Sequence, residues 1–147
     1  MSYSSGKKHI GMLLKCIDKK VVSAFNKELE QFDITLMQNE VLRYIYFHEE
    51  KQDVFQKQIE EFFNSTNPTI TGILKRLESK ELIKRETSMV DARYKKLTLT
   101  KKGRDLSEKT LELGPKKIEY KLTQRLSSEE RDELERLLIL VLEGLEN

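Results

Sequence analysis

Residues 65–104 read STNPTITGILKRLESKELIKRETSMVDARYKKLTLTKKGR, and this stretch decides the fold. Its first half predicts a helix, because apolar residues recur at i, i+3, i+4 and i+7 and form one buried stripe. The stripe consists of Ile70, Ile73, Leu74 and Leu77. On the opposite face the side chains are short, polar or basic, so nothing bulky would prevent a close approach to a partner. That face presents Pro68, Thr69, Thr71, Gly72, Lys75 and Arg76.

Two short strands are predicted to follow this helix. Residues 82–87 and 93–98 are rich in side chains that favour a pleated strand, and residues 88–92 connect them. A helix with a polar outer face followed by a basic hairpin is the element order of a winged helix-turn-helix. We therefore predict a mostly α fold with a small β-hairpin wing (α+β), and the expected partner is double-stranded DNA.

Charge is divided unevenly along the chain. The whole sequence has a net charge of +2, but residues 64–104 hold eleven Lys/Arg against four Asp/Glu, a local charge of +7. A positive surface on the helix and hairpin is what phosphate binding requires. A lysine-rich surface that serves only solubility is the alternative, and charge alone favours nucleic acid by a small margin.

Helices are also predicted on both sides of the central stretch. Apolar residues keep helical spacing over residues 9–31, after a mobile arm at residues 1–7. A helix from residue 101 should be interrupted or ended near Gly114 and Pro115, because proline removes a backbone donor. Polar residues at the expected helix starts should act as caps, two of them within capping boxes with Gln38 and Glu130. These caps are Thr35, Asp53, Thr66 or Asn67, Thr100 and Ser127.

The last helix carries more apolar surface than one buried side requires. Beyond its main stripe it adds Ile139 and Leu140, which points to a subunit interface rather than a monomer core. We therefore predict a homodimer with two regions: residues 1–34 and 100–147 form a helical dimerisation region, and residues 35–99 form the DNA-binding domain. The main stripe consists of Leu134, Leu137, Leu138, Val141, Leu142 and Leu145.

Several other classes of protein are not expected. The N-terminus lacks an apolar run for a signal sequence, and the longest apolar run, residues 137–142, is far short of a membrane span. A cytoplasmic protein is the simplest expectation. With one cysteine, Cys16, and two separated histidines, His9 and His48, we expect no disulfide framework, no metal and no cofactor. No catalytic motif is recognisable, so an enzyme is not expected.

The sequence resembles the MarR family of winged helix-turn-helix transcription regulators over almost its whole length. The resemblance rests on residues 67–78, then 82–85, the Asp-Ala-Arg of residues 91–93, and the Leu-Thr-Leu-Thr-Lys-Lys-Gly of residues 97–103. It implies a homodimer on a pseudo-palindromic operator, with the helix from residue 67 in the major groove and the wing in an adjacent minor groove. It also implies a repressor, less often an activator, that a small ligand or oxidation often releases.

Three positions depart from the family pattern. Glu81 stands where a glycine commonly ends the recognition helix, and Asn64 replaces another frequent glycine, which is milder because asparagine tolerates a positive φ. Glu60 replaces a small residue of the preceding helix and is expected to tilt it. None of the three removes a predicted DNA contact.

The outward face of the helix suggests roles for its residues. Thr69, Thr71 and Lys75 are expected to face base edges, where Gly72 allows a close approach, and Asn67 and Arg76 to divide between bases and phosphates. The alternative is that they form an ordinary solvated face. With the wing residues the predicted DNA-binding set is Thr66, Asn67, Pro68, Thr69, Thr71, Gly72, Lys75, Arg76, Ser88, Asp91, Arg93 and Lys95.

The wing supplies the second half of the predicted interface. Arg93 is expected to enter the minor groove, with Asp91 holding its guanidinium in position. A surface salt bridge that only stiffens the hairpin is the alternative. Lys95, Lys96 and Ser88 are expected to contact phosphates without reading sequence.

Two further hypotheses concern how the protein is regulated. A cavity lined by Ile17, Phe25, Tyr44 and Phe47 would suit a small lipophilic or aromatic effector, and ordinary core packing is the alternative. Cys16 could sense oxidants, but Gly11 occupies the position of the sensing cysteine in related sensors, so an incidental cysteine is favoured. The rival to DNA binding is a winged-helix dimer that serves as a protein-interaction scaffold.

Overall fold

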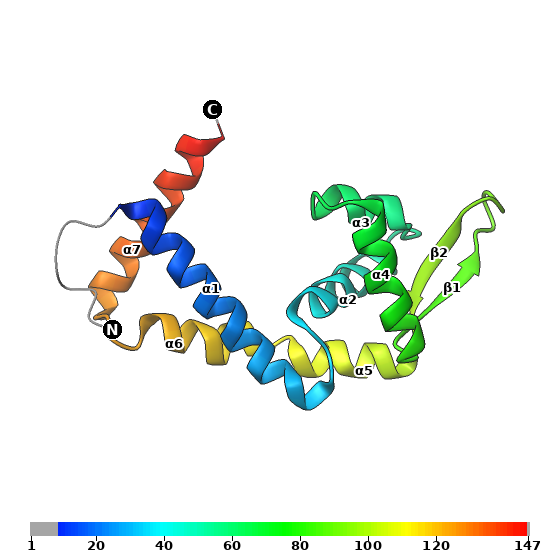
Figure 1. Cartoon of the computed structure of the whole chain (residues 1–147), viewed down its shortest axis with the longest axis horizontal. Helices are drawn as coiled ribbons and strands as arrows, with labels where there is room; N and C mark the ends of the chain where they lie inside the picture. The colour runs from blue at the N-terminus through cyan, green and yellow to red at the C-terminus, as the bar shows by residue number, and fades with distance from the viewer. Residues whose placement is uncertain (1–8, 147) are drawn as a thin grey trace. The chain divides into compact units, whose positions relative to one another are not determined.

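The computed structural model describes residues 9–146 (Figure 1). The predicted arm at residues 1–7 lies outside the described residues. The chain divides into two compact units, the first ending at Glu112 and the second beginning at Leu113, and each is described by itself. No helix within residues 9–146 is long and apolar enough to cross a membrane.

The first unit contains the predicted winged helix-turn-helix, and the predicted fold class is confirmed. In Figure 1 the hairpin lies beside α4, and α3 and α2 lie on the other side of that helix. Its elements are α1 (Ile10–Leu29), the 3-10 helix η1 (Glu30–Phe32), α2 (Leu36–His48), α3 (Gln56–Phe62), α4 (Asn67–Ser79), β1 (Ile83–Thr87), β2 (Lys95–Leu99) and α5 (Lys101–Thr110).

Four of the predicted caps are confirmed. Thr35 and Gln38 form the capping box of α2, each side chain accepting the other residue's backbone N–H at 3.2 Å. Thr66 caps α4, Thr100 caps α5 through the Gly103 N–H at 3.0 Å, and Ser127 caps the last helix. Each cap satisfies backbone donors that a helix start leaves without partners.

The predicted Asp53 cap is wrong, because α3 begins three residues later, at Gln56. Val54 is fully buried, and its carbonyl accepts a hydrogen bond from the Leu97 N–H at 2.7 Å. This bond holds the segment before α3 in extended form against β2. The Gln58 side chain then accepts the Phe55 N–H at 2.6 Å at the actual helix start.

The hairpin has a longer connection than predicted. β1 pairs antiparallel with β2 in a register that joins Ile83 to Leu99 and Thr87 to Lys95. The second strand therefore begins at Lys95, two residues later than expected, and residues 88–94 form the connection. The Tyr94 N–H bonds to the Asp91 carbonyl and the Ser88 N–H to the Tyr94 carbonyl, so the last residues of the connection close a turn.

The core of the first unit is apolar and contains a few paired polar groups. The Thr110 hydroxyl of α5 donates to Asn39 of α2 at 2.9 Å, and both residues are buried. Glu49 accepts the Leu99 N–H at 2.9 Å and also pairs with Arg104. These bonds satisfy polar groups that would otherwise be costly to bury. Fully buried apolar side chains include Val41, Leu42, Ile45, Val54, Ile59, Ile70, Leu74, Leu77, Ile83 and Leu97.

Two of the three departures from the family pattern occupy left-handed backbone positions. Glu81 has a φ of 59° and Asn64 a φ of 47°, so each accepts a conformation that glycine adopts at less cost. After Glu81 the Leu82 N–H bonds to the Leu77 carbonyl at 3.0 Å, which closes the end of α4. The turn into the wing is therefore made without glycine.

The second unit is helical. The predicted interruption at Gly114 and Pro115 takes the form of a π-helix, η2 (Leu113–Ile118), which runs into α6 (Glu119–Thr123) and is followed by α7 (Ser128–Leu145). Pro115 has no backbone N–H and cannot complete the α-helical bonding pattern, and a π-helix accommodates such a residue. Arg131 joins α7 to α6 through Glu119 at 3.1 Å.

Both long helices expose apolar side chains. Ile10 and Met12 of α1 are more than half exposed, and the stripe and flanking residues of α7 are also exposed. The α7 set comprises Leu134, Leu137, Leu138, Ile139, Leu140, Val141, Leu142 and Leu145. Exposed apolar side chains in this number on one helix are typical of a surface that a partner covers.

The packing of α5 against the start of the wing can be tested by substituting Gly103. A Cβ at this position would lie 2.0 Å from the Leu82 carbonyl oxygen, which is backbone and cannot rotate away. We expect Gly103→Ala to lower the free energy of unfolding by about 1–3 kcal/mol, because overpacking forces a backbone shift. Chemical denaturation measures this change. Gly72→Ala is the control, since its Cβ would meet only the flexible Arg76 guanidinium, at 3.7 Å, and an equal loss in both variants would contradict the packing argument.

Candidate nucleic-acid interface

The outward face of α4 is open, as the sequence predicted. The apolar stripe is buried, whereas Thr66, Asn67, Pro68 and Thr69 at the start of the helix are exposed. Lys75 and Arg76 are also exposed, and Thr71 and Gly72 are half-buried. The helix therefore presents its N-terminal half and one basic turn to solvent.

Gly72 has no packing partner that requires a glycine. A Cβ there would meet only the Arg76 guanidinium, at 3.7 Å. The space outside Gly72 is therefore left open by the protein itself. This agrees with the idea that its missing side chain serves the approach of a partner.

A polar network joins α3 to the start of α4. Gln56 Nε2 donates to the Thr71 hydroxyl at 2.7 Å, and that hydroxyl donates to Asn67 Oδ1 at 3.4 Å. Asn67 Nδ2 donates to Glu60 Oε2 at 3.1 Å. Thr71, predicted to face base edges, and Asn67, predicted to divide between bases and phosphates, are thus held in position by Gln56 and Glu60 of the preceding helix.

Sequence reasoning missed Gln56 as a functional residue and noted Glu60 only as a departure from the family. Their one signal in the sequence is the i, i+4 spacing, which places both on one face of α3. That spacing does not show which helix the face meets. The contact with Asn67 and Thr71 comes from tertiary packing alone.

The wing holds Arg93 as predicted. Arg93 donates through Nε and Nη2 to the Asp91 carboxylate, with the shortest contact at 2.7 Å, and its backbone N–H donates to the same carboxylate at 3.0 Å. These bonds lower the pKa of Asp91, the side-chain bond from Arg93 being the larger cause. The guanidinium is positioned but remains largely exposed, with 83% of the side chain open to solvent.

Ser88 requires a correction. It was expected to contact phosphate, but it is 4% exposed, and its hydroxyl accepts the N–H groups of Val90 and Asp91 at 3.2 and 3.4 Å. Ser88 therefore shapes the wing tip from inside. The residues that the tip presents are Met89 and Val90, each more than nine-tenths exposed.

A groove lies between α3, the start of α4 and the base of the wing. Its volume is about 280 Å³, and both the Gln56 network and Arg93 reach it. Lys95 is held at its edge by a bond to the Thr87 hydroxyl at 2.9 Å. Positive side chains outnumber the single carboxylate of Glu60; the charged residues of the lining are Lys57, Glu60, Arg85, Arg93 and Lys95.

The residues predicted for an effector pocket lie on α1 and α2 and differ in exposure. Tyr44 stacks on His48, with ring centroids 4.1 Å apart, and lies against Phe62. Phe47 and Ile17 are each about half exposed, and Phe25 is half-buried. Two depressions of the first unit, this groove and the one described below, are lined by other residues. The effector pocket therefore stays a prediction.

Cys16 lies half-buried on α1 as a free thiol. Within residues 9–146 no three His, Cys, Asp or Glu side chains gather in a way that could hold a metal ion.

The fold and this surface together define a winged helix-turn-helix protein of the DNA-binding kind, and comparison with known proteins gives the family. The model of the MarR family matches residues 34–95. The reduced form of MarR from E. coli has a TM-score of 0.83 and 27% identity, over 94% of this chain and 99% of that chain. No curated protein matches the sequence significantly.

Two structures of a Staphylococcus aureus regulator are also similar. The MepR–DNA complex has a TM-score of 0.80 and 30% identity, over 94% of this chain and 99% of that chain. MepR itself, a transcription regulator of the multidrug efflux pump MepA, has a TM-score of 0.79 and 30% identity over the same shares. The chain therefore belongs to the MarR family of transcriptional regulators that bind DNA.

The Asp91–Arg93 pair can be tested by titration. The pKa of Asp91 should lie below its ordinary value of 3.8 and return toward it in Arg93→Gln, because the guanidinium stabilises the carboxylate. With a lowered folded pKa, the pair contributes stability above the ordinary pKa and loses it as the pH falls through the folded value. Carboxyl carbon shifts followed by NMR give both values. Lys95→Gln is the control, and an unchanged Asp91 pKa in Arg93→Gln would refute the pairing.

Proposed function

We propose that this protein is a homodimeric repressor that binds a pseudo-palindromic operator sequence-specifically and is released by a small ligand. The observation that carries the DNA-binding part is the prearranged surface of α4 and the wing. Gln56 and Glu60 hold the base-facing side chains Asn67 and Thr71, and Asp91 holds Arg93. Such preorganisation lowers the entropy cost of binding.

Each side chain of this surface receives a role. Thr69, Thr71 and Lys75 address base edges in the major groove, where lysine suits the guanine acceptors and threonine methyls suit thymine. Asn67 suits adenine, although its amide already bonds to Glu60 on one side. Arg76 divides between bases and phosphates. Thr66 and Pro68 begin the helix close to the backbone, as N-cap and in the first turn.

The wing supplies the second contact. Arg93 enters the minor groove, where negative potential is concentrated, and the exposed tip residues Met89 and Val90 lie against the sugars. Lys95 at the groove edge contacts phosphate. The MepR–DNA complex, similar to this chain over almost its whole length, supports the assignment of this surface to DNA.

The dimer rests on the exposed apolar faces of α1 and α7. A monomer would leave these faces in water, whereas a second copy of the chain would bury them in an interface of the obligate kind. Two copies related by a twofold axis would place two α4 helices on successive major grooves about 34 Å apart. The operator is therefore expected to be pseudo-palindromic.

The scaffold alternative is disfavoured by the chemistry of the surface. A protein-binding face would carry an apolar patch at α4, whereas this face carries threonine, asparagine, lysine and arginine. Repression and its release by a ligand rest on the family resemblance. The redox alternative rests on Cys16, a free and half-buried thiol, alone.

Operator binding is tested first by selecting bound duplexes from a random pool and measuring the affinity of the winner across salt concentrations. We expect a twofold-symmetric motif and a steep salt dependence, because bound phosphates release counterions.

Arg93→Ala and Lys75→Ala should each weaken binding by about 1–3 kcal/mol, with relaxed base preference for Lys75→Ala. Lys51→Ala, an exposed lysine outside this surface, is the matched control. Absence of an enriched motif would reject sequence-specific recognition.

The hydrogen bonds that Gln56 and Glu60 of α3 make to α4 predict opposite effects on operator affinity when each residue is substituted. Gln56→Leu removes the bond that orients Thr71, and we expect operator affinity to fall several-fold while the base preference under Asn67 and Thr71 relaxes. Glu60→Gln keeps an acceptor for Asn67 but removes a negative charge near the phosphates, so affinity should rise and the salt dependence should steepen. Fluorescence anisotropy with operator variants measures both. Gln52→Leu, an exposed glutamine, is the control, and equal behaviour of all three variants would exclude the network from recognition.

A further inference from the structure

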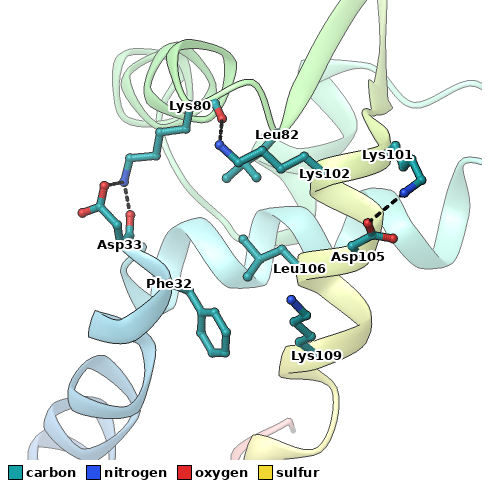
Figure 2. A pocket seen from close by; sticks show the side chains of 9 residues that line it. All are labelled: Phe32, Asp33, Lys80, Leu82, Lys101, Lys102, Asp105, Leu106 and Lys109. Atoms are coloured by element: carbon teal, nitrogen blue, oxygen red, sulfur yellow. Dashed lines mark hydrogen bonds and ion pairs between the residues drawn. The ribbon is translucent and has the colours of Figure 1, made fainter.

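A second depression of the first unit lies at the C-terminal end of α4, away from the helix start that carries Thr66 to Thr69. Its volume is about 660 Å³, within the range of about 300–1,000 Å³ typical of small-molecule sites. Figure 2 shows its walls: η1 and the turn after it on one side, the end of α4 and the start of β1 above, and α5 on the other side. All of these elements belong to the first unit.

The depression combines an apolar floor with amino groups at its rim. Leu82 and Leu106 are buried, and the half-buried Phe32 ring lies beside them. In Figure 2 the Phe32 ring and the Leu106 side chain point into the space between η1 and α5. A planar or apolar group of a ligand could rest there with its charged end at the rim.

Four lysines and two aspartates line the rim of the depression. Because each aspartate pairs with one lysine, two positive charges remain without a carboxylate partner among the residues that the structure describes. Lys80 lies 3.7 Å from the Asp33 carboxylate, and Lys101 lies 3.5 Å from the Asp105 carboxylate. Lys102 donates to a carbonyl oxygen instead, and Lys109 has no ion pair within the described residues. Two ammonium groups are thus without a carboxylate partner on one side of the depression.

Two uncompensated ammonium groups suit a ligand with two negative charges. A phosphate monoester carries a charge of about −1.5 to −2 near neutral pH, whereas a carboxylate or sulfonate carries one. We propose that this depression, which we call the lysine pocket, is a binding site for a small organic phosphate monoester. Lys102 and Lys109 bind its phosphate, and Phe32, Leu82 and Leu106 hold its apolar part.

The lysine pocket is connected to the end of the recognition helix. Lys102 Nζ donates to the Lys80 carbonyl oxygen at 3.0 Å, at the residue that follows α4. The Lys80 ammonium in turn bonds to the Asp33 carbonyl oxygen. A phosphate that draws Lys102 away removes a partner from the last carbonyls of α4, which such lysines satisfy. Ligand binding should therefore loosen the hold on α4 and lower operator affinity, a consequence that rests on the proposed function.

Binding is tested without DNA, so its outcome does not depend on the proposed function. Phenyl phosphate is the probe, and isothermal titration calorimetry on the full chain should give one site per subunit. Benzenesulfonate has a similar ring but one charge, and inorganic phosphate has the charge but no ring; each should bind at least tenfold more weakly. Equal affinity for benzenesulfonate would overturn the requirement for two charges, and equal affinity for inorganic phosphate would overturn the role of the floor.

Variants locate the site. Lys109→Gln alone removes an exposed side chain, and we expect the affinity for phenyl phosphate to fall at least fivefold with an unchanged thermal unfolding midpoint. The Lys102→Gln/Lys109→Gln double variant should abolish measurable binding. Lys51→Gln and Lys75→Gln remove the same charge elsewhere, and both should bind as the unchanged protein does. Loss in Lys75→Gln with no loss in Lys109→Gln would place the phosphate on the DNA surface and overturn the proposal.

A separate measurement addresses the link to DNA. Saturating phenyl phosphate should weaken operator binding at least threefold in the unchanged protein and have no effect in the double variant. If the protein binds phenyl phosphate by calorimetry but its operator affinity is the same with and without it, the proposed effect on DNA binding is overturned, whereas the phosphate site is still supported. A protein that binds no operator at all, yet binds the probe, would refute the proposed function alone.

Discussion

The end of α4 is the junction on which the DNA-binding surface depends. Leu82 N–H closes the helix onto Leu77, and Glu81 turns the chain through a left-handed position. The Thr100 hydroxyl bonds to the Glu81 carbonyl at 2.6 Å, while Gly103 lets α5 pack against the Leu82 backbone. These contacts fix the recognition helix, the start of the wing and α5 relative to one another. Without them Arg93 and Lys75 would have no defined separation, and a groove-matching surface could not form.

The polar contacts around α4 differ in what they do. The contacts at its start, from Gln56 and Glu60, orient the outward side chains of Thr71 and Asn67. Those at its end, from Lys102 and Thr100, satisfy backbone carbonyls, and they act on the position of the helix. Contacts that orient side chains are thus separate from contacts that hold the end of the helix in place. This is the physical basis for placing a control site at the lysine pocket.

The two long helices show why the single chain is incomplete. Apolar residues of α1 and α7 remain exposed although the core around α2 and α4 is fully buried. With 37% hydrophobic residues in the whole chain, a core closed within one subunit would be lean, and long helices that bury their apolar faces against a second subunit compensate for it. Burying the exposed faces against a second copy would supply most of the driving force for assembly.

Local features of the chain were determined by the sequence itself. The caps Thr35, Thr66, Thr100 and Ser127, the stripe of α4 and the Asp91–Arg93 pair all depend on residues within a few positions of one another, so spacing alone predicts them. The predicted Asp53 cap failed because of a distant partner, since Val54 bonds to Leu97 and α3 begins only at Gln56. The Ser88 prediction failed for a local reason: the wing connection folds back so that its hydroxyl accepts the N–H groups of Val90 and Asp91. Only the tertiary structure brought Gln56 onto Thr71 and assembled the lysine pocket from residues between Phe32 and Lys109. Spacing cannot show such contacts, because they follow from how separate helices pack.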